Sequence, residues 1–241
     1  MLSEAKSRSA GKIKFGVITF PGSNTDYDSY YALSEVLGNK VEQIWHKDRD
    51  LKNSDVIVLP GGFSYGDYLR TGAIARFSPI MESVIEFADK GGIVIGICNG
   101  FQILLEAGLL PGVMLRNESL KFICKDAYLS VQTRNNIFTK NIEKDVIKIP
   151  MKHGEGNYFA DEETLKELEK NDQIVFKYSS KEGNTGQAFN ANGSQQNIAG
   201  ITNKKKNILG MMPHPENACD PVLRKTDGSF IFRSVVQSLL N

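Results

Sequence analysis

The chain has 241 residues, a net charge of +1 and 41% apolar residues, a composition typical of a soluble globular protein. The near-neutral charge gives no support for binding to nucleic acid or to an acidic membrane surface, and no apolar stretch is long enough to span a bilayer. The three cysteines, Cys98, Cys124 and Cys219, form no CxxC pair, which fits a reducing cytoplasm and argues against a disulfide framework or a metal site.

The first twelve residues differ in composition from the rest of the chain. They are small and polar, so residues 1–12 are expected to form a flexible tail. Residues 13–241 contain no obvious linker, repeat or low-complexity segment. The simplest prediction is therefore that they form a single domain.

The first half alternates apolar runs with helical patterns. Strands are expected at residues 14–20, 41–45, 55–59 and 92–97. Helices are expected from about residue 26 to residue 37, at 79–89 and at 101–108. Continuous apolar strands that alternate with helices are typical of a parallel sheet covered on both faces.

The second half contains shorter strands separated by turn residues. They are expected at residues 122–124, 128–133, 146–149, 174–178, 198–202 and 208–211, with a hairpin turn at 203–207. Helices are expected at 164–170 and 229–240. The predicted fold class is α/β, with a mostly parallel central sheet flanked by helices and with extra short strands in the second half.

A turn around Cys98 carries the strongest chemical signal. Gly96 to Gly100 (GICNG) lies between an apolar strand and a helix, the order of a nucleophile elbow, in which the reactive side chain sits at the turn. The flanking glycines suit crowded backbone and a positive φ. The positive end of the helix dipole favours a thiolate. A free cysteine is more often a small buried apolar residue, but the surroundings here favour a nucleophile.

A cysteine nucleophile needs a base, and His214 is the best placed of the three histidines. Pro213 and Pro215 are expected to hold this segment extended and to exclude a helix. Residues two apart in an extended segment point to the same side, roughly 6–7 Å apart, so His214 and Glu216 would face one pocket. Glu216 would then orient the imidazole, and the other ring nitrogen would take the thiol proton. Taken alone, the His-Pro-Glu segment could equally be a surface turn.

An oxyanion hole is expected beside the elbow. One donor would be the backbone N–H of Asn99, and the second the backbone N–H of Gly62, which follows the strand at 55–59. One such donor is typically worth about 2.7–4 kcal/mol in the rate. A plain strand-to-helix turn is an equally good interpretation of Pro60-Gly61-Gly62 in isolation.

Together these residues resemble the class I (triad-type) glutamine amidotransferases. The family pattern G-x-C-x-G-x-Q is met by Gly96, Cys98, Gly100 and Gln102, and its downstream H-P-E by residues 214–216. The resemblance implies a flavodoxin-like amidotransferase fold. It also implies that Cys98, His214 and Glu216 form a triad that hydrolyses glutamine through a γ-glutamyl thioester.

The same resemblance suggests which residues bind the substrate. Gln102 would help to hold glutamine, and the segment His153-Gly154-Glu155 would lie near its α-amino and carboxylate groups. For His153 a purely structural role in a loop is an equally good interpretation.

The loop at residues 61–73 and the segment at 153–156 resemble those of family members that serve purine biosynthesis. The resemblance implies that the ammonia passes to a large synthetase subunit, which converts formylglycinamide ribonucleotide to formylglycinamidine ribonucleotide with ATP. A small accessory subunit would complete the assembly. No cofactor is expected in this chain, and ATP and magnesium would bind to the synthetase. The protein is expected to work in the cytoplasm.

Three alternatives stay open from the sequence. The chain could be the glutaminase subunit of a different class I amidotransferase. It could be a related peptidase or glyoxalase-like enzyme with an elbow cysteine. It could also be a degenerate domain that acts as a regulator, although the intact triad positions argue against this.

Overall fold

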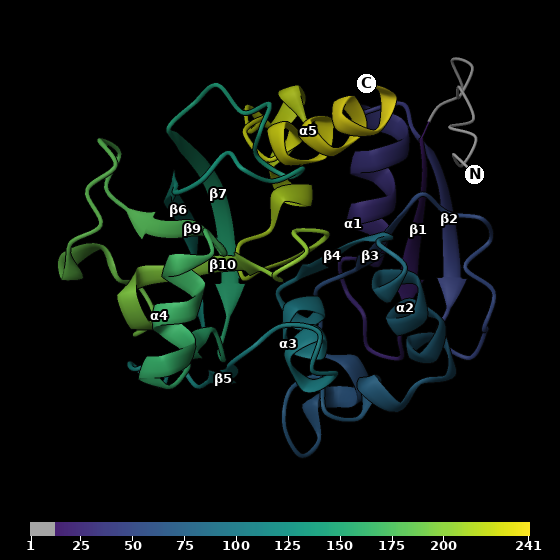
Figure 1. Ribbon diagram of the computed structural model, residues 1–241, viewed down its shortest axis with the longest axis horizontal. Coiled ribbons are helices and arrows are strands. Elements are labelled where there is room, and N and C mark those ends of the chain that lie inside the picture. Colours follow the sequence, from purple (N-terminus) through teal and green to yellow (C-terminus); the bar gives the residue numbers. More distant parts are fainter. Residues whose placement is uncertain (1–12) are drawn as a thin grey trace, which may run out of the picture.

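The computed structural model describes residues 13–241, so the predicted tail at residues 1–12 lies outside the described part of the chain. A nine-stranded sheet in the order β2-β1-β3-β4-β11-β10-β9-β6-β7 forms its centre (Figure 1). The five strands from β2 to β11 are parallel: β1 (Lys14–Thr19), β2 (Lys40–Trp45), β3 (Val56–Leu59), β4 (Ile93–Ile97) and β11 (Ile208–Met211).

The other strands continue the sheet in antiparallel pairs. They are β10 (Ile198–Thr202), β9 (Ile174–Ser179), β6 (Ile123–Val131) and β7 (Val146–His153). The expected hairpin turn between β10 and β11 is confirmed, since these strands pair antiparallel. A separate two-stranded sheet consists of β5 (Val113–Leu115) and β8 (Asn157–Phe159).

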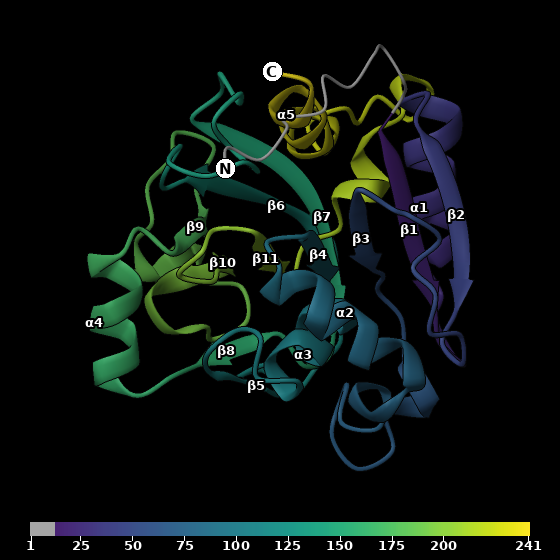
Figure 2. The same cartoon turned by 45° about the vertical axis from the view of Figure 1, so that its right-hand side comes forward.

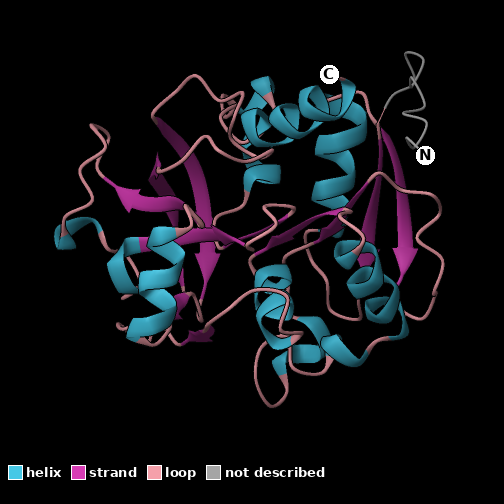
Figure 3. Ribbon diagram, in the orientation of Figure 1, coloured by secondary structure: helices cyan, strands magenta, loops and turns pink. Residues whose placement is uncertain are grey.

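Helices cover both faces of the parallel strands, as Figures 1 and 3 show: α1 and α5 lie on one side, and α2 and α3 on the other. The α-helices are α1 (Asp26–Tyr31), α2 (Pro79–Asp89), α3 (Asn99–Glu106), α4 (Glu162–Lys170) and α5 (Ser229–Leu240). A π-helical segment, Ala32–Val36, extends α1 to the predicted end near residue 37. In Figure 2, α4 lies beside the antiparallel strands, away from α1.

The burial of the parallel strands explains their continuous apolar sequences. All residues of β3, β4 and β11 are buried, as the continuous apolar runs predicted, because helices cover both faces. Of the parallel strands, only β2, at the edge of the sheet, has exposed residues. The predicted α/β class with flanking helices is confirmed.

The second half differs from the expected strands in two respects. The segments predicted at 122–124 and 128–133 belong to one strand, β6, because its residues pair with β7 from Ile123 to Ser130 without interruption. The short strands β5 and β8 were not predicted from the sequence. They pair only with each other, through three residues each, too few for a recognisable alternation.

Candidate active site

Cys98 lies where β4 ends and α3 begins. Its own backbone adopts φ 50° and ψ −105°, a sparsely populated conformation for a residue with a side chain. The positive φ expected for the flanking glycines therefore falls on the cysteine. The glycines instead relieve crowding: a β-carbon at Gly100 would lie 1.9 Å from the carbonyl oxygen of Leu59, and one at Gly96 would lie 2.7 Å from the oxygen of Gly100. The neighbouring backbone thus fixes the position of the thiol.

His214 and Glu216 form a buried pair beyond the end of β11. Nδ1 of His214 lies 2.5 Å from Oε1 of Glu216, and the two residues are 1% and 5% exposed. The expectation that the segment excludes a helix was wrong, because Pro215–Ala218 forms a 3₁₀ turn that starts directly after His214. Pro215 tolerates this first helical position, where its missing N–H is not needed. The turn brings the carboxylate back to the imidazole.

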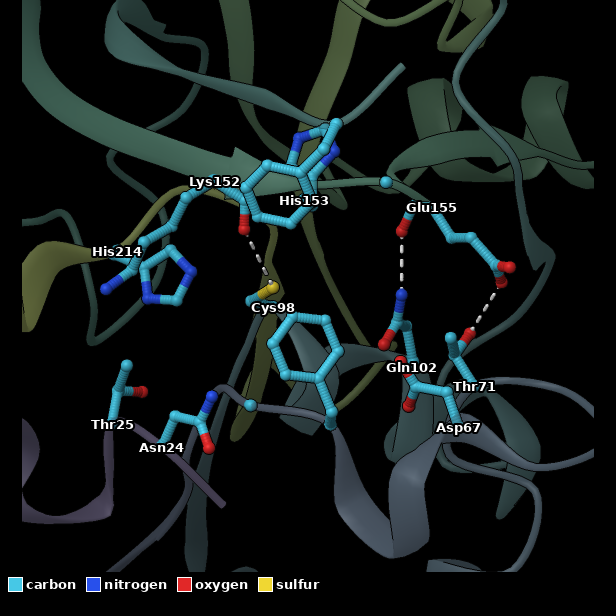
Figure 4. Close-up of a pocket in the computed structure, with 14 residues that line it drawn as sticks. Asn24, Thr25, Asp67, Thr71, Cys98, Gln102, Lys152, His153, Glu155 and His214 are labelled. Carbon is cyan, nitrogen blue, oxygen red and sulfur yellow. Dashed lines mark hydrogen bonds between the residues drawn. The ribbon is translucent and has the colours of Figure 1, made fainter. Parts of the chain in front are cut away.

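The electrostatics of His214 suit a base that holds the thiol proton. Burial lowers the pKa of His214, but the negative charges of Glu216 and of the Cys98 sulfur outweigh it and raise the pKa to about 10. Because Nδ1 faces a carboxylate, it carries a proton. The other nitrogen, Nε2, has no hydrogen-bond partner among residues 13–241. Figure 4 shows the imidazole and the Cys98 thiol as neighbours in the pocket.

The loop after β3 lies beside the elbow. Gly62 adopts φ 145°, and a β-carbon there would lie 2.6 Å from the backbone nitrogen of Asn24. Asn24 and Thr25 donate from their backbone N–H groups to the Gly61 carbonyl, and Phe63 donates to the Gly22 carbonyl. The loop that carries the expected oxyanion donor is thus tied to the turn after β1.

Asn99 connects this loop to the elbow through its side chain, which sequence reasoning missed. Its Oδ1 accepts from the backbone N–H of Ser64 at 3.1 Å, and its Nδ2 donates to Oε1 of Gln102 at 2.9 Å. Gln102 in turn donates from Nε2 to the carbonyl of Glu155 at 2.7 Å. One chain of hydrogen bonds therefore joins the Gly62 loop, the elbow and the 153–156 segment. An amide keeps a further N–H and a further lone pair, so Gln102 is still able to contact a ligand.

His153 is buried and neutral. Burial, and then the charge of His214, lower the pKa of His153 to about 4. Its Nδ1 lies 3.0 Å from Oδ1 of Asn117, which also accepts from the backbone N–H of Gly156. Because the Asn117 oxygen only accepts, Nδ1 of His153 must donate, and Nε2 presents a lone pair. Asn117 had no signal in the sequence, since it reaches the histidine from 36 residues away.

Cys98, Gln102, His153 and His214 line one pocket of about 220 Å³, shown in Figure 4. This volume lies below the range of about 300–1,000 Å³ for drug-sized ligands and suits a single amino acid. The pocket is lined by Asn24, Thr25, Gly62, Phe63, Asp67, Thr71, Cys98, Gln102, Phe122, Lys152, His153, Gly154, Glu155 and His214. The structure thus brings together Gly62, Cys98, Gln102, His214 and the 153–155 segment. Asn24, Thr25, Thr71 and Lys152 were not predicted.

Within residues 13–241, no group of three or more His, Cys, Asp or Glu side chains is arranged to hold a metal ion. No helix in the same range is long and apolar enough to cross a membrane.

Comparisons with known proteins agree on one family. The model of the CobB/CobQ-like glutamine amidotransferase domain matches residues 12–229. The "Phosphoribosylformylglycinamidine synthase subunit PurQ" of Koribacter versatilis is 56% identical over 228 residues, which cover 94% of this chain and 99% of the relative. The protein of the same name from Moorella thermoacetica is 56% identical over 225 residues, or 93% of this chain and 95% of the relative.

Solved structures give the same result. A chain in the structure of PurLQS from Thermotoga maritima superposes with a TM-score of 0.83 at 39% identity, over 95% of this chain and 99% of that one. A glutamine amidotransferase from Thermotoga maritima superposes with a TM-score of 0.54 at 15% identity, over 95% of this chain and 93% of that one, and shares the fold.

Proposed function

The chain belongs to the CobB/CobQ-like glutamine amidotransferase family, and from this premise we infer that it is the glutaminase component of a phosphoribosylformylglycinamidine synthase. It hydrolyses L-glutamine to glutamate and ammonia for purine biosynthesis. The ammonia serves the ATP-dependent conversion of formylglycinamide ribonucleotide to formylglycinamidine ribonucleotide. We further propose that residues 13–241 form a single domain and that the protein works in the cytoplasm.

The observation that carries the mechanism is the buried His214–Glu216 pair, whose imidazole lines the same pocket as the strained Cys98. We propose that Cys98 is the nucleophile, His214 the base and Glu216 the group that orients it. The thiolate attacks the side-chain amide carbon of glutamine and forms a carbon–sulfur bond. His214 then gives its proton to the leaving nitrogen. The carbon–nitrogen bond breaks, ammonia departs, and a γ-glutamyl thioester remains on Cys98.

The second half of the reaction uses the same groups. His214 takes a proton from water, and the resulting hydroxide attacks the thioester carbonyl. The carbon–sulfur bond breaks, glutamate leaves, and the imidazole again holds the proton beside the thiolate. We propose that the backbone N–H groups of Gly62 and Asn99 stabilise the oxyanion that develops in both steps.

We propose that Gln102, His153, Gly154 and Glu155 bind the substrate. All four line the pocket, and the hydrogen bond from Gln102 to the carbonyl of Glu155 fixes the helix and the segment relative to each other. His153 contributes a lone pair rather than a charge, because it is neutral above a pH of about 4.

The partners of the chain are the large synthetase and the small accessory protein of the same enzyme, in line with the match to PurLQS. We propose that this chain uses no cofactor and that ATP and magnesium bind to the synthetase. The amination step then takes place on the partner, which receives the ammonia.

The decisive experiment uses the assembled complex with Cys98→Ala. Glutamine-dependent synthesis should disappear, while synthesis from added ammonium should continue at the wild-type rate. Loss of both activities would contradict the assignment of Cys98 to ammonia production.

A further inference from the structure

A cluster of three polar side chains joins the loop that carries Gly62 to the elements beside it. Oη of Tyr65 lies 2.8 Å from Nδ1 of His46 and 3.0 Å from Oγ of Ser78, and the last two atoms lie 3.2 Å apart. His46 directly follows β2 and Ser78 directly precedes α2, and both residues are 4% exposed. None of the three side chains takes part in the catalytic steps above.

Tyr65 adopts a backbone conformation that large side chains rarely occupy. Its φ of 54° and ψ of 27° lie in the left-handed region, which glycine or asparagine adopts more readily. Strain of this kind persists only where the surroundings hold the residue in place. A tyrosine at this position therefore indicates that its side chain has a role of its own.

Ser78 contacts the loop and leaves its own helix without a side-chain cap. A serine directly before a helix commonly accepts a hydrogen bond from one of the first N–H groups of that helix. Here the side chain of Ser78 makes no such bond to α2, and its Oγ lies within hydrogen-bond distance of Tyr65 and His46 instead. The contact with Tyr65 thus takes the place of the usual role of this residue.

Tyr65 lies three residues after Gly62, and hydrogen bonds fix the backbone between them. The N–H groups of residues 63, 64 and 65 donate to the Gly22 carbonyl, to Oδ1 of Asn99 and to the Pro21 carbonyl, at 2.9, 3.1 and 2.6 Å. A displacement of Tyr65 would therefore also displace the peptide of Gly62, which lines the pocket.

Resting on the proposed glutaminase function, we propose that Tyr65 is a positioning residue for the oxyanion donor and acts through His46 and Ser78. The contacts of the hydroxyl hold the side chain, the side chain holds the strained backbone, and this backbone fixes the peptide of Gly62. Oxyanion stabilisation depends on donors that are in place before the charge develops. Loss of the hydroxyl therefore weakens this stabilisation but leaves the thiol and its base unchanged.

The test compares two reactions of Cys98 in the assembled complex. Hydrolysis of glutamine develops an oxyanion, whereas alkylation by iodoacetamide displaces iodide from a saturated carbon and develops none. Tyr65→Phe should lower kcat for glutamine hydrolysis roughly 10- to 100-fold, up to the loss for a group misplaced by about 1 Å, with KM within about threefold. The rate of alkylation at pH 7 reports the thiolate and should stay within about twofold. Synthesis from ammonium should continue at the wild-type rate.

Ser78→Ala tests whether the cluster acts as a unit. Because the side chain of Ser78 does not cap α2, its removal should act on the loop and lower kcat in the same way. In the double variant with Tyr65→Phe, the further loss should be less than about twofold, since both changes remove the same contact. Tyr68→Phe is the matched control, because it removes a hydroxyl from a 75% exposed tyrosine of the same loop, and its kcat should equal that of the wild type.

Four results would overturn the proposal. An unchanged kcat for Tyr65→Phe would mean that the hydroxyl does not hold the loop, and an equal loss in Tyr68→Phe would mean that the effect is not specific to it. Equal slowing of hydrolysis and alkylation would mean that Tyr65 supports the pocket as a whole. Independent losses in the double variant would mean that Tyr65 and Ser78 act separately. Failure of the wild-type complex to hydrolyse glutamine would instead overturn the proposed function.

Discussion

The imidazole of His214 lies directly against the backbone of Gly61. A β-carbon built on this glycine would lie 2.6 Å from Cε1 of His214 and 2.9 Å from Oγ1 of Thr25. The first glycine of the loop after β3 therefore sets the position of the proposed base, while the second carries the expected oxyanion donor. The contact with the imidazole and the expected donor thus come from neighbouring residues, Gly61 and Gly62, which follow the carboxyl end of β3.

Gly61→Ala should displace the imidazole without straining the backbone, since Gly61 has no positive φ. A shift of about 1 Å at a catalytic group costs on the order of 100-fold in rate, so kcat for glutamine hydrolysis should fall by that factor. Synthesis from ammonium should be unchanged. Gly186→Ala is the control, because its nearest neighbour is the movable end of the Asn184 side chain at 3.2 Å. An unchanged kcat for Gly61→Ala would mean that the imidazole is not held by this contact.

Glu216→Gln should remove the charge that offsets the burial of His214. The pKa of His214 should then fall, because burial alone disfavours the imidazolium. The comparable carboxylate-to-amide change in a serine protease triad lowers kcat by about 10⁴, and we expect a loss of similar order in glutamine hydrolysis. Alkylation of Cys98 at pH 7 should slow in parallel. Glu86→Gln, on the exposed face of α2 and paired with Lys90, should leave both rates unchanged.

The strain at Cys98 predicts an unusual order of stability. Glycine tolerates φ 50° and ψ −105° better than alanine does, so Cys98→Gly should be more stable than Cys98→Ala by about 1–2 kcal/mol. The ordinary order is the reverse, because glycine gains more entropy on unfolding. Urea denaturation of the two inactive variants measures the difference.

Cys219 provides the matched control for this comparison. It is also a buried free cysteine, but its backbone has an ordinary φ of −113°. Cys219→Ala should therefore be more stable than Cys219→Gly. If both positions show the ordinary order, the conformation at Cys98 carries no strain.

The residues that we propose to react could be picked out from the sequence, because their chemistry restricts residue type and spacing. Cys98 between two glycines, and a histidine two residues before a glutamate, are recognisable without coordinates. The 3₁₀ turn at Pro215 was not recognisable from the sequence. It packs against Gly228, where a β-carbon would lie 2.0 Å from the carbonyl oxygen of Pro215. The two segments are 13 residues apart, and no local pattern reports their contact.

Groups that act through long-range contacts were likewise beyond the sequence. The side chain of Asn99 reaches Ser64, and Asn117 reaches His153, each across more than 30 residues. Single asparagines have no periodicity and no motif, so their partners are determined only by the folded chain. For β6, the sequence analysis expected a break at residues 125–127, but these residues pair with β7 like the rest of the strand.

The buried neutral state of His153 predicts a specific loss of stability in acid. An unfolded chain takes up a proton at this residue near pH 6.5, but the folded protein does so only near pH 4. Between these values the unfolded state binds more protons, so the free energy of unfolding falls as pH falls, by up to about 3 kcal/mol from this group. His153→Asn keeps a donor toward Asn117 but does not titrate. The difference in unfolding free energy between wild type and variant should therefore shrink from pH 6.5 to pH 4. The contributions of other titrating groups, such as Asp67, are the same in both proteins and cancel in that difference. Urea denaturation at pH 4.5, 5.5 and 7 measures it, and a difference that is constant with pH would show that His153 is not buried as a neutral group.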